Sequence, residues 1–323
     1  MENLLFIDNN DHRRRIIRDY NSIKSETRSS FINGTGMAFG HHGELIQGAV
    51  KDKLKGNRRF LVTLPWRKVH SHVNFVPIKN CGLFVNPNWK TKSHKAARLT
   101  LNYLGIYGYG GYLTIHAKAL PEQGFGSSTS DVVATIRSVA DACNQTLTPY
   151  EICSIAIESE FACDPIMFED EPVVFCQREG VIMEHLLKKL PPTFVVGFNT
   201  SDSGKGVSTL NHPLPDYNHQ EMITFRHLLE QLKIAINDQS VQLLGEVATK
   251  SAHINQQFLP KPNFEALLNI LNETGACGLQ IAHSGNIAGF LLDPNDSYLI
   301  KRYLNMRNEL ANVGIKNIWH FIT

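Results

Sequence analysis

The sequence predicts an α+β fold, because segments with strand-like and helix-like periodicity are intermixed along the whole chain. A chain of 323 residues, of which 42% are hydrophobic and 19% charged, can bury a sizeable core and has the composition of a globular protein. The Pro191-Pro192 pair interrupts the chain just before a new strand-like segment. We therefore expect an N-terminal extension at 1–30 and two domains, at 31–190 and 191–323.

Two periodicities define the expected elements. Alternating apolar and polar residues predict strands, and apolar residues three or four positions apart predict helices. In the first domain these patterns predict strands at 31–39, 59–65, 69–77 and 112–120, and helices at 92–104, after Ser127 and from Pro149. In the second domain they predict strands at 193–199, 279–282, 287–292 and 317–321, and helices at 222–236, 241–258, 264–273 and 297–309. A further helix is expected at 12–23 in the extension.

Charge and cysteine content narrow the classes of function. The 32 basic and 30 acidic residues give a formal net charge of +2, and the cluster Arg13-Arg14-Arg15 is too short for a nucleic-acid-binding surface. No segment approaches the length of a membrane span, and the N-terminus lacks the order of a secretory signal. Six cysteines without a C-x-x-C pair suit a reducing compartment. We expect a cytoplasmic protein that binds neither nucleic acid nor membrane, with a homodimer left open.

The most informative segment is Pro121-Glu-Gln-Gly-Phe-Gly-Ser-Ser-Thr-Ser-Asp131, which joins a predicted strand to a predicted helix. Gly124 and Gly126 allow the backbone to approach a ligand closely, and the first turn of the helix offers unpaired N–H groups to an anion. An ordinary loop with a serine N-cap would use the same residues. The segment lacks the Gly-Lys-Ser/Thr of a Walker loop and the G-x-G-x-x-G of a dinucleotide-binding loop. With the two motifs that accompany it, the segment indicates a phosphate-handling enzyme.

Those accompanying motifs are GELIQG at 43–48, within a glycine-rich stretch, and AHSGN at 282–286, followed by an apolar run. In this order the three motifs resemble those of the GHMP kinase superfamily, over most of the chain from about residue 33 onward. Within the superfamily the chain most resembles the L-threonine kinases of cobalamin side-chain synthesis. The resemblance implies a two-domain sandwich, with a ribosomal-protein-like N-terminal domain, a ferredoxin-like C-terminal domain and an active site in the cleft between them.

The resemblance also implies that the central loop binds ATP. The nucleotide-binding residues would be those of the loop and of the first helical turn, namely Pro121, Gly124, Phe125, Gly126, Ser127, Ser128 and Thr129. Ser128 matches the family serine that contacts magnesium, so ATP and Mg²⁺ are the expected cofactors.

The segment Glu158-Ser-Glu-Phe-Ala-Cys-Asp164 resembles an acidic segment of the threonine kinases. It predicts Asp164 as the group that accepts or orients the acceptor's hydroxyl proton. Glu160 is the predicted carboxylate ligand of Mg²⁺, together with Ser128, and Glu158 is the alternative. A helix that ends in acidic surface residues before a plain Asp-Pro turn would also explain the pattern.

Acceptor-binding residues are expected in other segments. Glu44 would suit an acceptor with an ammonium group, and His42 is expected to contact the acceptor. His41 and His42 should point in opposite directions, and a metal site from that pair lacks a third ligand. The predicted hairpin tip supplies three further candidates, His283, Ser284 and Gly285, although a plain turn also fits Ser-Gly-Asn. The loop at 202–209 is either a solvated turn or part of the acceptor side.

Together these expectations describe an ATP-dependent kinase that phosphorylates a hydroxyl of a small amino-acid-like acceptor, with L-threonine giving O-phospho-L-threonine as the leading reaction. Alternatives are a kinase for homoserine, an isoprenoid alcohol or a sugar, and a catalytically silent relative that binds a nucleotide or metabolite. The chain departs from the threonine kinases at 41–43, where it reads His-His-Gly, and in the central loop, which lacks their lysine. These departures bear on the acceptor more than on phosphoryl transfer.

Overall fold

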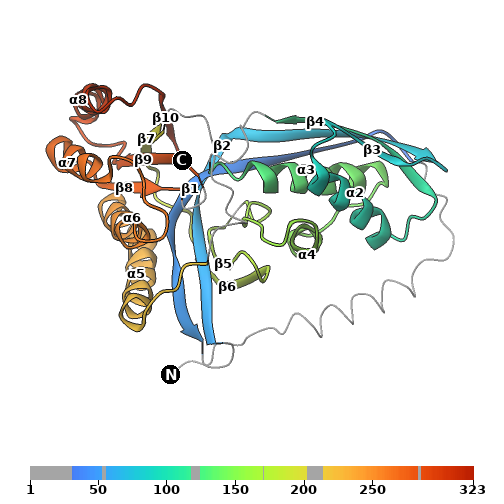
Figure 1. Ribbon diagram of the computed structural model, residues 1–323, viewed down its shortest axis with the longest axis horizontal. Coiled ribbons are helices and arrows are strands. Elements are labelled where there is room, and N and C mark those ends of the chain that lie inside the picture. The colour runs from blue at the N-terminus through green and yellow to red at the C-terminus, as the bar shows by residue number, and fades with distance from the viewer. Residues whose placement is uncertain (1–30, 53–55, 118–123, 170, 202–213, 283–284) are drawn as a thin grey trace.

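The computed structural model describes residues 31–52, 56–117, 124–169, 171–201, 214–282 and 285–323. The strands form one long sheet, and helices pack against both of its ends, with α2, α3 and α4 at one end and α5 to α8 at the other (Figure 1). The predicted α+β class is therefore confirmed. Five expectations lie outside the described residues: the helix at 12–23, Pro121, the loop at 202–209, His283 and Ser284.

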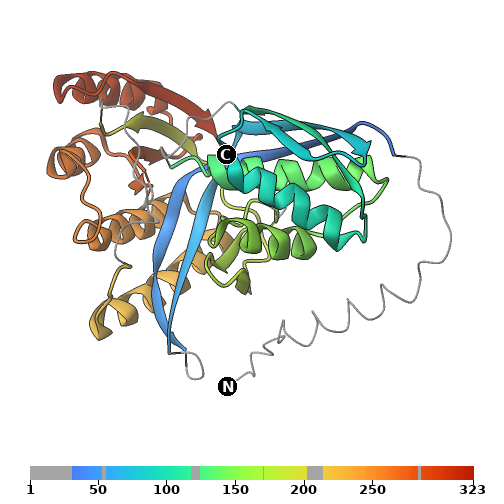
Figure 2. The same ribbon diagram turned by 45° about the vertical axis from the view of Figure 1, so that its right-hand side comes forward.

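Two long antiparallel strands form the backbone of the molecule. Strand β1 spans Gly34–Asp52 and β2 spans Gly56–Lys79, and they remain paired from Gly34 opposite Phe75 to Asp52 opposite Gly56. The sequence predicted shorter strands here because glycines and Pro65 interrupt the alternation. The structure accommodates these residues in register shifts between Phe39 and Ile46, where the ladder is irregular but does not end. In Figure 2 the blue pair runs from the lower middle of the view to its right-hand side, with the yellow to red helices on its left.

The first end of the sheet carries three helices. Strand β4 (Tyr109–Ala117) pairs with β2, and β3 (Leu83–Asn86) pairs with β4 in parallel. Helices α2 (Thr91–Tyr103), α3 (Ser127–Ala142) and α4 (Pro149–Glu160) are close to the predicted ranges. Helix α4 begins with the Thr148–Glu151 capping box and proline in its first turn. Strand β3 was not predicted, since four residues carry too little periodicity.

The second end is a smaller antiparallel sheet covered by four helices. Its strands are β7 (Phe194–Asn199), β8 (Gly278–Ile281), β9 (Ile287–Leu292) and β10 (Ile318–Ile322). Its helices are α5 (His219–Asn237), α6 (Val241–Asn255), α7 (Phe264–Thr274) and α8 (Leu299–Asn312). All eight elements were predicted, with ends that differ by a few residues, because their periodic patterns are long and clear.

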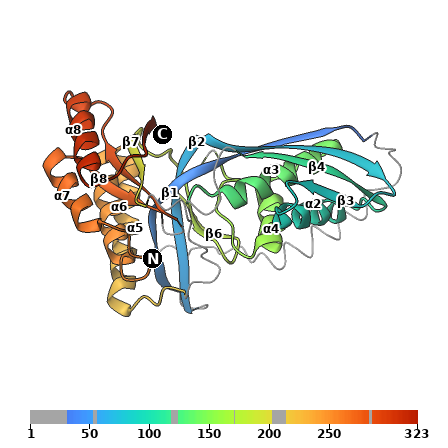
Figure 3. The same ribbon diagram turned by 45° about the horizontal axis from the view of Figure 1, so that its top comes forward.

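A single backbone pairing, Glu44 opposite Ile281, joins the two ends of the sheet. It gives the strand order β10-β7-β9-β8-β1-β2-β4-β3, with β5 (Val173–Cys176) and β6 (Val181–His185) beside β2. Glu44 therefore sits where the two ends meet, next to the bulges of β1. Figure 3 shows β1 and β2 between the two groups of helices.

The core does not divide cleanly at residue 190. Leu45, in the second half of β1, and Phe60, near the start of β2, pack in one buried cluster with Phe225 and Leu228 of α5. Residues before 190 thus contribute to the core of both ends. This continuous packing holds the bulged part of β1 between the two ends of the molecule. Among the described helices, none is long and apolar enough to cross a lipid bilayer.

Candidate active site

The N-terminus of α3 is open toward the bulge of β1. Gly126 adopts a left-handed conformation, with φ of 66°, and no side chain caps the helix. The first N–H groups of α3 are therefore directed outward with the positive end of the helix dipole. The loop is held against β1 by a hydrogen bond of 3.1 Å from the His41 N–H to the Phe125 carbonyl. This geometry suits an anionic group such as a phosphate.

Three side chains meet at this helix start. The Ser128 hydroxyl donates to Glu160 Oε2 at 2.7 Å, and the Lys92 ammonium donates to Ser128 Oγ at 2.9 Å. Lys92 Nζ is also 3.5 Å from Glu160 Oε2. The predicted pair of Ser128 and Glu160 is thus brought together by α3 and the end of α4, with a lysine from α2 that was not predicted.

Glu160 has the environment of a cation ligand. Its Oε1 atom is buried and has no hydrogen-bond partner among the described residues. Burial raises the pKa of Glu160 to about 7, against the lowering effect of Lys92 and of the Ser128 hydrogen bond. A divalent cation bound there would satisfy the unpaired oxygen and favour the ionised carboxylate. Glu158, the alternative ligand, is exposed on the same helix.

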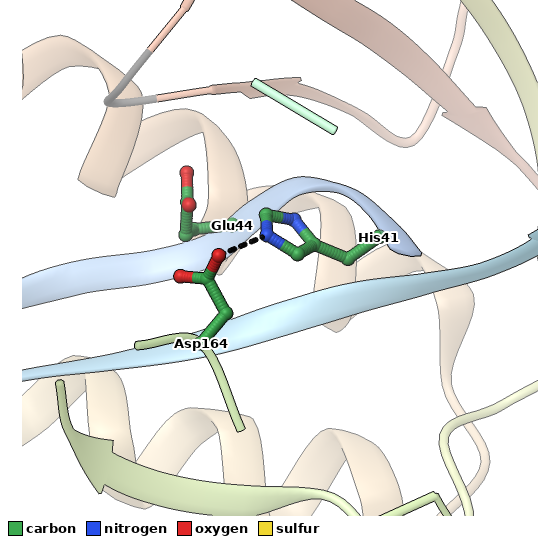
Figure 4. A group of neighbouring side chains, drawn as sticks. All are labelled: His41, Glu44 and Asp164. Atoms are coloured by element: carbon green, nitrogen blue, oxygen red, sulfur yellow. Dashed lines mark ion pairs between the residues drawn. The ribbon is translucent and has the colours of Figure 1, made fainter. Parts of the chain in front are cut away.

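Asp164 faces His41 at the end of the glycine loop. Asp164 Oδ2 lies 3.0 Å from His41 Nε2, and the Asp164 N–H donates to Thr129 Oγ1 at 3.2 Å. A Cβ atom placed on Gly126 would lie 2.4 Å from the His41 ring and 3.1 Å from Asp164 Oδ2. The open helix start and the Asp164 carboxylate are therefore in direct contact. Figure 4 shows His41 and Asp164 directed toward each other, with Glu44 beside them.

The two groups hold each other in the charged form. Burial by itself would lower the pKa of His41, but the Asp164 carboxylate outweighs it, and the pKa of His41 is raised. Burial likewise opposes ionisation of Asp164, but the His41 charge and hydrogen bond outweigh it, and the pKa of Asp164 is lowered. Asp164 is a fixed carboxylate at neutral pH.

Glu44 completes a cluster around this pair. One ligand atom each from His41, Glu44 and Asp164 lies within 4.8 Å of the others. The carboxylates of Asp164 and Glu44 favour the protonated form of His41. A metal ion bound to His41 would have to displace that proton. We therefore regard these three side chains as charged groups that face a substrate, and not as the ligands of a metal ion. Glu44 is 2% exposed and is held in place by its pairing between β2 and β8.

His42 points the other way, as expected from its position next to His41. It is fully buried, and its Nδ1 lies 2.9 Å from Gln280 Oε1. The rings of Trp66, Trp319 and Phe321 surround it. Burial lowers the pKa of His42 to about 4. The expectation that His42 contacts the acceptor does not fit this placement, because a neutral ring packed among aromatic residues has no open surface. Its role here is to fill the junction between the two ends of the sheet.

The AHSGN hairpin approaches the glycine loop, as the three motifs together suggested. A Cβ atom placed on Gly124 would lie 2.5 Å from Ala282 Cβ and 3.4 Å from Gly285 Cα. Gly124, which has φ of 99°, is thus pressed against the hairpin with no room for a side chain. Gly285 therefore lies close to the glycine loop, and its role in binding the acceptor stays a prediction.

Three residues of the site were missed from the sequence. Lys92 lies in the first turn of α2, where a positive charge is unfavourable for the helix dipole, and that position was a usable signal. Lys261 lies between Pro260 and Pro262, which restrict its backbone. His41 was considered only as half of a metal pair. The partner of each comes from a distant segment, so spacing could not reveal the contact.

A cavity of about 650 Å³ also reaches His41. Its walls include Phe39, Trp66, Phe168 and Phe321. Of the polar side chains described above, His41 alone lines it. Arg67, Lys68 and Lys189 also line the cavity, but Ser128, Glu160 and Asp164 do not, so we assign the candidate active site to the polar cluster and not to this cavity.

Comparisons with known proteins show which families the chain is similar to. The GHMP kinases N terminal domain family matches residues 92–166, which include Lys92, Ser128, Glu160 and Asp164. L-threonine kinase of Salmonella typhimurium (strain LT2) is 29% identical over 176 residues, 53% of this chain and 56% of that enzyme. L-threonine kinase of Citrobacter freundii is 42% identical over 66 residues, 20% of this chain and 23% of that enzyme. The chain thus matches 56% of the length of the first relative and 23% of the length of the second.

Solved structures match over a larger part of the chain. Homoserine kinase from Cytophaga hutchinsonii superposes with a TM-score of 0.64 at 12% identity, covering 92% of this chain and 97% of that one. Mevalonate kinase from methicillin-resistant Staphylococcus aureus gives a TM-score of 0.58 at 18% identity, covering 90% and 98%. At such identities these structures establish the fold alone. Residues 92–166 thus match the N-terminal domain of the GHMP kinases in sequence, and the chain shares the fold of homoserine and mevalonate kinases.

Proposed function

We propose that the protein is an ATP-dependent kinase that transfers the γ-phosphate to a hydroxyl of an amino-acid acceptor, with L-threonine as substrate and O-phospho-L-threonine as product. The observation that carries this proposal is the contact between two parts of the site. The Asp164 carboxylate lies against Gly126, at the open start of α3. A phosphate held at the helix start would therefore be adjacent to a carboxylate that can receive a hydroxyl.

The start of α3 and Lys92, which we assign to the nucleotide, offer groups that bind an anion. The unpaired N–H groups at the start of α3 would donate to phosphate oxygens, and Gly126 leaves the backbone accessible. Lys92, which is 38% exposed, could turn from Ser128 toward a phosphate and neutralise part of its charge.

Ser128 and Glu160 would hold Mg²⁺, since a hydroxyl and a carboxylate are the oxygen ligands that this cation prefers. The bound cation would neutralise charge on the phosphates. The unpaired, buried Glu160 Oε1 supports this assignment.

Asp164 would position the acceptor. Because its pKa is lowered, it is ionised and accepts a hydrogen bond from the acceptor's hydroxyl. In a loose transition state, proton removal can follow bond breaking, so orientation matters more than basic strength. His41 fixes the carboxylate by its contact at 3.0 Å and is a positioning residue.

The acceptor is inferred from charge and from relatives. Glu44, beside Asp164, suits an ammonium group, which L-threonine and homoserine carry and mevalonate and sugars lack. The curated relatives that match the chain are L-threonine kinases. A catalytically silent relative remains the competing interpretation. The intact set of Ser128, Glu160 and Asp164 favours a kinase.

A panel of acceptors tests the proposal. L-threonine, L-serine, L-homoserine, mevalonate and a sugar are each incubated with ATP and Mg²⁺, and ADP release and product mass are measured. We expect the highest kcat/KM with L-threonine and a product heavier by one phosphoryl group. If no acceptor stimulates ADP release while ATP binds, the silent interpretation replaces the kinase.

A further inference from the structure

Lys261 is a buried cation without an ion-pair partner among the described residues. It lies in the loop between α6 and α7, and the residue is 6% exposed. Its ammonium donates a hydrogen bond to the Gly285 carbonyl. An ammonium has three donors, so this bond leaves two of them for other groups.

Such a placement is costly unless a negative charge compensates it. Buried lysines are rare in folded proteins unless they are paired. Here burial lowers the pKa of Lys261 to about 8, and the charge of Glu44 opposes this effect. Lys261 therefore retains its positive charge near neutral pH, and no ion pair to it is found among the described residues.

The surroundings of Lys261 connect it to the glycine loop and to Glu44. Gly285, which accepts its hydrogen bond, opens the turn into β9, and a Cβ atom on Gly124 of the glycine loop would come within 3.4 Å of Gly285. Glu44 is paired with Ile281 at the start of the same hairpin. The ammonium thus contacts Gly285, which lies near Gly124 of the glycine loop, and the charge of Glu44 acts on it.

We propose that Lys261 is a binding site for an oxyanion of a substrate. Two groups share this chemistry, the carboxylate of an amino-acid acceptor and a phosphate of the nucleotide. With the acceptor's carboxylate on Lys261 and its ammonium group on Glu44, the two residues would bind both charges of a zwitterionic amino acid. An amide or an amino alcohol lacks the carboxylate. The site rests on the proposed function for the identity of its ligand.

The experiment compares wild type with Lys261→Met, which keeps the length of the side chain and removes its charge. Lys250→Met, which removes an exposed lysine from α6, is the matched control. Circular dichroism and thermal melting verify folding, and Lys261→Gln replaces the methionine variant if that variant does not fold. Turnover is measured with L-threonine and with L-threoninamide, and binding of AMP-PNP, inorganic phosphate and L-threonine is measured by calorimetry.

We expect Lys261→Met to lower kcat/KM for L-threonine by roughly 10- to 100-fold, the scale of a lost hydrogen bond to a charged group. L-threoninamide, AMP-PNP and Lys250→Met should show little change, which assigns the site to the acceptor carboxylate. Equal losses with both acceptors, with weaker binding of AMP-PNP or inorganic phosphate, assign it to a phosphate. If none of these affinities or rates changes, the oxyanion site is wrong.

Failure of the proposed function gives a different result. In that case wild type itself shows no turnover with L-threonine. The calorimetric comparison then still decides, because an oxyanion site requires that Lys261→Met bind at least one of the three probes more weakly than wild type does.

Discussion

The proposed nucleotide side and the proposed acceptor side of the site are built in different ways. On the nucleotide side, Gly126 and Ser128 are neighbours in one motif, and Glu160 follows on the next helix. On the acceptor side, His41, Asp164 and Lys261 come from three segments far apart in the chain. The first arrangement is a local property of a loop and a helix start. The second depends on how the two ends of the sheet meet, so it can change while phosphoryl transfer is retained.

The largest effect is expected from Gly126→Val, which places a side chain where the two sides of the site meet. Gly126 has φ of 66°, and a Cβ atom would lie 2.4 Å from the His41 ring. A branched residue is strained there and closes the approach to the helix start. We expect loss of ATP binding in calorimetry and loss of turnover. Tight ATP binding by a folded variant would show that the nucleotide lies elsewhere.

The nucleotide side is tested next by Glu160→Gln, with the neighbouring Glu158→Gln as control. Glu160 is buried against Ser128, whereas Glu158 is exposed. We expect turnover of Glu160→Gln to fall roughly a hundredfold at fixed Mg²⁺, with partial recovery at higher Mg²⁺. Glu158→Gln should remain close to wild type in the same assay. The reverse pattern would move the carboxylate ligand to Glu158.

A smaller effect, on stability, is expected from His41→Asn on the acceptor side. The pKa of His41 is raised above its ordinary value of 6.5, so its protonated form stabilises the fold below that pH, and the contribution is lost as pH rises through the folded pKa. A tenfold difference in proton affinity between the folded and unfolded states corresponds to about 1.4 kcal/mol of folding free energy. Urea unfolding should therefore show a larger difference between wild type and His41→Asn at pH 6 than at pH 9. A difference that grows with pH would contradict the charged pair.

The same contrast explains what could be predicted from the sequence. Helix α3 and its glycine loop were predicted because their signals lie within a few adjacent residues, and the long helices of the second end have clear periodicity. Strands β1 and β2 were predicted as shorter pieces, since bulges conceal their continuity. The contact of His41 with Asp164 joins residues separated by more than a hundred positions. No local pattern encodes such a contact.

His42 shows the limit of transferring a role by motif alone. It lies two residues before Glu44, in the motif that resembles the family, and was expected to contact the acceptor. The direction of each side chain on a strand alternates, so His41 and His42 face opposite sides of β1. His42 therefore fills an aromatic cluster, whereas His41 orients Asp164. A motif identified the segment but not which of two neighbouring residues faces the site.

The most direct test of the account is the effect of Asp164→Asn on the enzyme's true acceptor. This change keeps the size of the side chain but removes the charge that orients the hydroxyl. Turnover should fall by roughly a hundredfold or more, while the affinity for ATP, measured by calorimetry, changes little because the helix start is intact. A residual rate is expected, since positioning and electrostatics at the nucleotide side remain. Near-normal turnover of a folded Asp164→Asn would contradict the account and remove Asp164 from the reaction.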